Sequence, residues 1–152
     1  MTKVELEEFV REVFASFNQT FYENDREVVL RAWWALLQDL EISLVRDRFI
    51  QMAVVAKVMP TPGSIRRSVV DESLESVPPS AQQAWAQLRK MAENVNRGTH
   101  QVMNVHDVFA KTINILGDSA FGLSTNGDRE YFMNVYGEQL NLYMIDAYKV
   151  KT

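Results

Sequence analysis

The 152-residue sequence contains no cysteine, which excludes disulfide frameworks, thiolate zinc sites and cysteine nucleophiles together. No apolar run approaches the roughly 20 residues that a membrane-spanning helix needs. Glu5, Glu7 and Glu8 stand near the N-terminus, where a secretory signal peptide would carry a basic opening and an apolar core. These absences predict a protein of the cytoplasm that needs no oxidising compartment and contacts no membrane.

Recognisable catalytic motifs are also missing. The segment 117–127 contains three glycines, but it lacks the Gly-Lys-Ser/Thr end of a phosphate-binding loop and follows no predicted strand. His100, His106 and Asp107 are the only group resembling a metal site, and surface or capping roles for the histidines are the favoured interpretation. We therefore expect no enzymatic activity, no metal and no cofactor.

Charge is distributed unevenly along the chain. Residues 1–43 carry four basic and nine acidic side chains, residues 44–67 carry five and one, and residues 68–152 carry seven and ten. The basic residues of the middle segment are Arg46, Arg48, Lys57, Arg66 and Arg67. They are candidates for contact with nucleic acid or with an acidic protein surface, while a solvated helix face is the more ordinary explanation.

Apolar residues recur at helical intervals throughout, and no segment shows the alternation of a strand. The patterns predict seven helices, near residues 4–21, 25–39, 43–57, 62–72, 81–95, 105–116 and 126–147. Acidic residues, serines and a Pro-Pro pair predict a linker over residues 73–80. We expect an all-α protein with two lobes, four helices in residues 1–72 and three in residues 81–152.

Trp33 and Trp34 cannot both face one core, because neighbouring helical residues project about 100° apart. If Trp33 packs with Leu37 and Phe49, Trp34 lies at the edge of the apolar face. From there it either seals the boundary between the lobes or anchors a partner.

Further along, Pro60 breaks a helix and Thr61 is the predicted N-cap of the next, with Pro62 at its first position and Ile65 on its buried side. The order over residues 31–67 is a Trp-Leu-Asp helix, a second helix, a Pro-Thr-Pro turn and an Ile-Arg helix. It resembles the phage-encoded, non-ATPase loaders and inhibitors of the replicative DNA helicase.

The resemblance implies a small non-enzymatic phage or prophage adaptor that binds the hexameric replicative helicase of a bacterial host and loads or inhibits it. Under that hypothesis, Trp34, Arg66 and Arg67 are the expected partner-binding residues. Both arginines are expected to be exposed, so that replacing them would weaken the complex and leave stability nearly unchanged.

Two alternatives remain open. Residues 44–72 have the order of a helix-turn-helix module that binds DNA, with Arg46, Arg48, Lys57 and Ser64 as possible nucleic-acid contacts. The other is a phage host-takeover protein that shares only the helical scaffold, since one helical architecture supports many roles.

Overall fold

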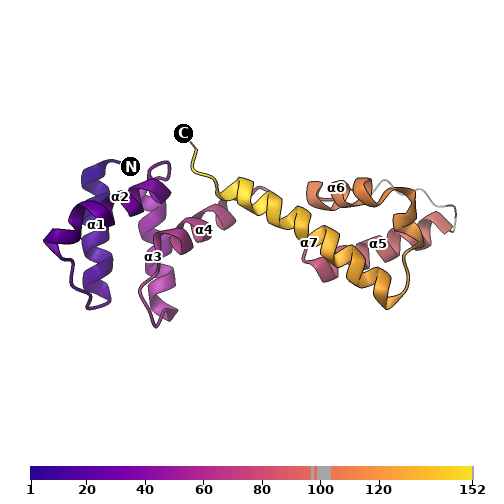
Figure 1. Cartoon of the computed structure of the whole chain (residues 1–152), viewed down its shortest axis with the longest axis horizontal. Helices are drawn as coiled ribbons and strands as arrows, with labels where there is room; N and C mark the ends of the chain where they lie inside the picture. The colour runs from indigo at the N-terminus through magenta and orange to yellow at the C-terminus, as the bar shows by residue number, and fades with distance from the viewer. Residues whose placement is uncertain (97, 99–103, 152) are drawn as a thin grey trace. The chain divides into compact units, whose positions relative to one another are not determined.

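The computed structural model describes residues 1–96, 98 and 104–151, and within these ranges its regular secondary structure is all helical, with no strand, as predicted (Figure 1). The seven α-helices are α1 (Lys3–Ser16), α2 (Arg26–Leu37), α3 (Ile42–Val55), α4 (Pro62–Ser73), α5 (Ala81–Asn96), α6 (Asp107–Leu116) and α7 (Asn126–Tyr148). Two 3₁₀ segments, η1 (Glu23–Asp25) and η2 (Gly117–Gly122), precede α2 and follow α6. None of the helices in these ranges is long and apolar enough to cross a membrane.

The chain forms two compact units. Unit 1 comprises Met1–Leu74 together with Tyr148–Thr152, and unit 2 comprises Glu75–Ala147. The sequence interpretation places a linker at residues 73–80, and the units observed here meet at residues 74 and 75. The last residues of the chain belong to unit 1, not to the C-terminal lobe, and most of the predicted linker belongs to unit 2.

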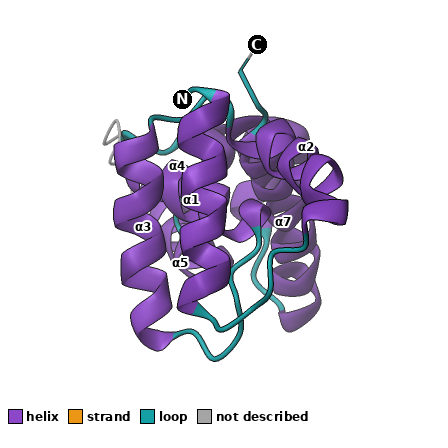
Figure 2. Ribbon diagram, turned by 90° about the vertical axis from the view of Figure 1, so that its left-hand side faces the viewer, coloured by secondary structure: helices purple, strands orange, loops and turns teal. Residues whose placement is uncertain are grey.

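Unit 1 is built around aromatic contacts among its first three α-helices. Phe9 of α1 meets Trp33 of α2 and Phe49 of α3 edge to face, with ring centroids 6.0 and 5.6 Å apart. Helices α1 and α3 lie side by side in Figure 2, and α4 packs against both α2 and α3. The buried side chains of this core are Leu6, Phe9, Val10, Val13, Trp33, Leu37, Val45, Phe49, Ile65 and Val69.

Helix α1 ends at Ser16, five residues earlier than its apolar pattern predicts. Asn18 has a φ of 52°, a left-handed conformation that asparagine tolerates better than most residues and that ends the helix. Phe17 and Phe21 still reach the core from the following loop, through edge-to-face contacts with Phe49 and Phe14. Their helical spacing in the sequence therefore reports that both side chains pack against the core, although their backbone is not helical.

Helix α4 begins as the sequence predicts. Thr61 is its N-cap, the Ser64 amide donates to the Thr61 hydroxyl at 3.2 Å, and Pro62 occupies the first helical position. Ile65 on the inner side is fully buried. This start fixes the side chains of α4 in a known register, and that register decides which arginine of the helix faces inward.

Unit 2 has its own core, formed by α5, α6, η2 and α7. Phe132 lies at its centre, with its ring 5.6 Å from that of Trp85, 6.4 Å from Phe109 and 6.0 Å from Tyr136. The Tyr136 hydroxyl donates to the carbonyl of Pro79. Because this bond holds the Pro-Pro pair against unit 2, the end of the predicted linker is packed and not free.

Candidate partner-binding site

Arg66 is not a surface residue, which corrects the expectation from sequence. Only 4% of its side chain is exposed, and Asp39, its ion-pair partner in the turn after α2, is 9% exposed. The guanidinium forms a two-pronged contact with the Asp39 carboxylate, at 2.6 and 2.9 Å. Arg66 therefore holds unit 1 together and cannot serve as a partner-binding side chain in this structure.

The remaining donors of Arg66 meet main-chain carbonyls. Leu36 accepts at 2.8 Å, Tyr148 at 2.5 Å and Lys149 at 2.6 Å. Burial on its own would raise the pKa of Asp39, but hydrogen bonds from Arg66 and from a backbone amide outweigh burial, and the pKa is lowered. The buried pair is thus a carboxylate and a guanidinium with their hydrogen-bonding groups satisfied.

The other members of the basic segment are engaged in different ways. Arg46 pairs with Glu12 at 3.1 Å, and Arg48 pairs with Glu72. The Ser64 hydroxyl donates to the Thr61 carbonyl at 2.8 Å and so belongs to the start of α4. Lys57 and Arg67 are exposed. Only these last two have the unoccupied, outward character that a phosphate contact requires.

Trp34 differs from Trp33 as the helical geometry predicts, since Trp33 is 5% exposed in the core and Trp34 is only partly buried. Trp34 lines a pocket of about 380 Å³ between α1 and α2. The other lining residues are Lys3, Leu6, Glu7, Arg26, Glu27, Leu30 and Arg31. The Lys3 ammonium lies 5.9 Å from the centre of the Trp34 ring, within the range of a cation–π contact.

Glu7 organises the charged side of this pocket. Its carboxylate accepts from Arg26 at 2.8 and 2.5 Å and from Arg11 at 3.0 Å, while Arg11 also contacts Glu23. Hydrogen bonds from Arg26 and then Arg11 lower the pKa of Glu7 from its ordinary 4.5 to about 2. The network leaves Lys3 and Arg31 as the pocket cations that do not contact Glu7.

The lowered pKa of Glu7 predicts an acid-sensitive contribution to stability. Because the folded pKa lies below the unfolded one, this contribution is present above pH 4.5 and is lost as pH falls toward about 2. We expect Glu7→Gln to reduce stability at pH 7, and the difference from the unmodified chain to narrow across that window. Chemical denaturation at several pH values, with a carboxyl NMR titration of Glu7, measures this; a constant difference would contradict it.

A run of exposed branched apolar residues lies near the end of α3. Ile50, Val54, Val55 and Val58 are each at least 60% exposed, and Lys57 stands among them. Ile50 and Val54 are four residues apart in α3 and so share one face of the helix. Clustered exposed apolar side chains are more typical of interaction surfaces than of a surface that meets only water.

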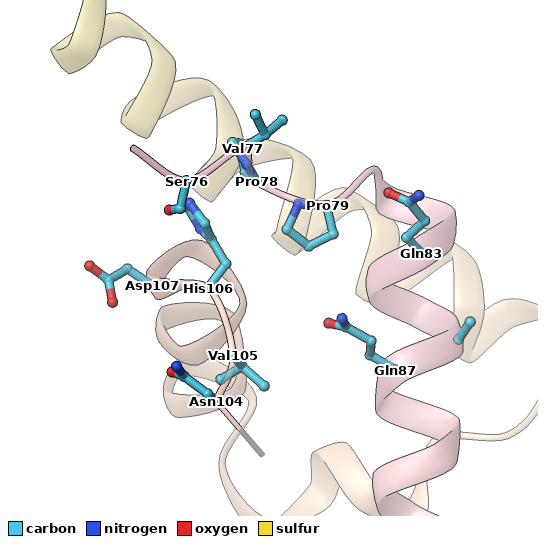
Figure 3. A pocket seen from close by; sticks show the side chains of 11 residues that line it. Ser76, Val77, Pro78, Pro79, Gln83, Gln87, Asn104, Val105, His106 and Asp107 are labelled. Atoms are coloured by element: carbon cyan, nitrogen blue, oxygen red, sulfur yellow. The ribbon is translucent and has the colours of Figure 1, made fainter. Parts of the chain in front are cut away.

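Unit 2 contains a larger pocket, of about 960 Å³, shown in Figure 3. Gln83 and Gln87 of α5 lie on one side, Pro78 and Pro79 cross its edge, and His106 lies at the start of α6. The lining consists mainly of neutral amides and apolar groups, which suits hydrogen bonding better than acid–base chemistry.

His106 is the N-cap of α6, since its Nδ1 accepts from the Val108 amide at 3.2 Å, and its ring meets Tyr143 edge to face. The capping interpretation of this histidine is confirmed. His100 lies outside the described residues. Among those that are described, no three histidine, aspartate or glutamate side chains gather closely enough to hold a metal ion.

Comparison with known proteins adds no further constraint on the site: no family model, curated protein sequence or solved structure matches this chain. Most residues on which the resemblance to helicase loaders rests prove to be structural. Trp33, Leu37 and Ile65 are core residues, and Asp39 and Arg66 form the buried ion pair. Trp34 and Arg31 are the members of that segment that line the open pocket between α1 and α2.

Proposed function

We propose that this chain is a non-enzymatic phage or prophage adaptor that binds the hexameric replicative helicase of its host and loads or inhibits it. The observation that carries the proposal is the position of Trp34, an aromatic side chain kept at the wall of an open pocket while its neighbour Trp33 fills the core. The identity of the partner rests on the resemblance of residues 31–67 to helicase loaders and inhibitors.

The chemistry around Trp34 is suited to a protein partner. Tryptophan is enriched among the residues that dominate interface energies, because it combines a large apolar surface with an N–H donor. Leu30 adds apolar surface. Among the charged lining residues, Lys3, Arg26 and Arg31 outnumber Glu7 and Glu27, so the opening carries a net positive charge. Such a pocket favours an apolar side chain flanked by acidic groups, where charge complementarity sets orientation and apolar burial supplies affinity.

The structure gives less support to the alternative of a DNA-binding module over residues 44–72. Arg46 and Arg48 are paired with glutamates of the same chain, and the Ser64 hydroxyl donates to the Thr61 carbonyl in the first turn of α4. A phosphate would have to displace these carboxylates before it could bind either arginine. DNA binding is therefore the less favoured function, and the experiment below includes a test for it.

We expect Trp34→Ala to weaken helicase binding by about 2 kcal/mol or more, close to thirtyfold in Kd, because truncating a central anchor removes its buried apolar contacts. Calorimetric titration of the purified helicase with each variant measures the change. Val28→Ala is the matched control, since Val28 is on the same helix, 68% exposed and outside the pocket.

Thermal unfolding of Trp34→Ala must accompany the titration, because Trp34 also packs against the core of unit 1. The same variants, together with Arg67→Ala, should be tested on duplex DNA at two salt concentrations. Two results together would favour the DNA-binding hypothesis over the adaptor hypothesis. The unmodified chain would not bind helicase, and Arg67→Ala would abolish its salt-sensitive binding to DNA. If the Trp34→Ala variant is folded and binds helicase with unchanged affinity, this pocket is not the helicase-binding site.

A further inference from the structure

Asp39 and Arg66 do more than pair with one another. The Tyr148 and Lys149 carbonyls accept from the Nε and Nη2 groups of Arg66, and the Lys151 amide donates to Asp39 at 2.8 Å. All three contacts lie within unit 1, which includes residues 148–152. The pair thus presents two donors and one acceptor to a single short segment of main chain.

We propose that Asp39 and Arg66 form a binding site for the main chain at the C-terminal end of a helix. Residues 148–151 of this chain, which begin at the last residue of α7, are its occupant. The groups recognised are internal carbonyls and an amide, so the site does not depend on a free terminal carboxylate. Recognition is specific for spacing: two consecutive acceptors, then a donor two residues later.

A side chain adds direction to this contact. The Tyr148 hydroxyl donates to the Asp71 carboxylate at 2.7 Å, on the outer side of α4. This bond distinguishes the first position of the segment from the others, whereas the Lys151 side chain has no contact with Asp39 or Arg66 in the structure. The site therefore recognises a tyrosine side chain at the first position and main-chain groups of Lys149 and Lys151.

The contact stays closed because its occupant is part of the same chain. A tethered segment has an effective concentration in the millimolar range, so even weak hydrogen bonds keep it bound most of the time. Opening would leave a buried guanidinium without two of its acceptors, which makes the closed form the favoured one. The segment then opens and closes as one local unit.

The test compares Lys151→Pro with Lys151→Ala in the full chain. Proline removes the amide that donates to Asp39, whereas alanine keeps it and removes only the side chain. We expect Lys151→Pro to accelerate hydrogen exchange of the Arg66 Nε–H at least tenfold, and Lys151→Ala to leave it within twofold, as measured by NMR. Equal effects of the two substitutions, or no effect of proline, would overturn main-chain recognition.

A second measurement uses a peptide supplied separately. In the full chain carrying Tyr148→Phe and Lys151→Pro, an acetylated and amidated peptide of residues 146–151 should shift the Arg66 Nε–H resonance in a saturable manner. The same peptide N-methylated at the Lys151 nitrogen should bind at least tenfold more weakly. Equal binding of the two peptides, or no binding of either to the folded variant, would show that no such site exists.

Discussion

Replacing Arg66 with alanine is expected to lower the free energy of unfolding of unit 1 by about 3–5 kcal/mol, the usual cost of removing one partner from a buried ion pair. The substitution leaves the Asp39 carboxylate desolvated without its counter-ion and leaves three carbonyls without their donor. Urea denaturation followed by the fluorescence of Trp33 and Trp34, both in unit 1, measures the change.

Arg67→Ala is the matched control for this prediction, because Arg67 is exposed on the same helix. We expect it to change stability by less than about 0.5 kcal/mol. The double variant Asp39→Leu with Arg66→Met should lose less than the sum of the single effects, since it leaves no charge buried without a partner. A single Arg66→Ala variant as stable as Arg67→Ala would show that the ion pair does not form in solution.

In unit 2 the largest expected effect belongs to Phe132. Its side chain is fully buried against Trp85, Phe109 and Tyr136. Phe132→Ala should lower the free energy of unfolding of unit 2 by about 3–5 kcal/mol, because the aromatic contacts are lost and the surrounding rings close the gap only in part. Fluorescence of Trp85 and amide hydrogen exchange in α5 and α7 report the change.

Tyr131 is the neighbouring aromatic residue, 56% exposed, so Tyr131→Ala is the control and should have a small effect. Exchange at Leu6 and Val10 in the core of unit 1 should stay slow in Phe132→Ala. If those amides lose protection as much as the amides of unit 2 do, the two units unfold together and are not separate cooperative bodies.

Local signals account for the parts of the fold that the sequence predicts well. Thr2 with Glu5, and Thr61 with Pro62, define helix starts within a few residues, and both caps are present in the structure. The end of α1 was missed because Phe17 and Phe21 keep a helical spacing while packing from a loop. Burial of an aromatic residue and helical backbone are separate properties, and periodicity reports only the first.

For the candidate site, too, the sequence predicts the features that depend on local geometry and misses those that depend on distant residues. The contrast between Trp33 and Trp34 follows from helix geometry alone, and their different burial confirms it. The role of Arg66 depends on Asp39, 27 residues away, and on carbonyls more than 80 residues away. The spacing of neighbouring residues does not reveal partners so distant in the sequence. The basic composition of residues 44–67 therefore predicts an exposed arginine, which is wrong for Arg66.

The position of the helix start at Pro62 indicates that Arg66 faces inward. With Thr61 as the N-cap, Ile65, Val69 and Val70 occupy the inner face of α4, and Arg66 lies between Ile65 and Val70 on that face. Arg67 lies about 100° further round. A polar residue in the inner register of a helix requires a partner, which is a prediction that the pattern supports even when the partner cannot be named.

Unit 1 includes residues on both sides of unit 2 in the chain, and this affects the order in which the two units can be completed during synthesis. Arg66 and Tyr148 are 82 residues apart. At roughly 5–20 residues per second, the Arg66 guanidinium waits about 4–16 s for its last acceptors while all of unit 2 is being synthesised. Helices α1–α4 can pack during that time, but the buried Arg66 side chain stays incompletely bonded until Tyr148 and Lys149 emerge. Unit 1 is therefore completed after unit 2, although most of its residues precede unit 2 in the chain.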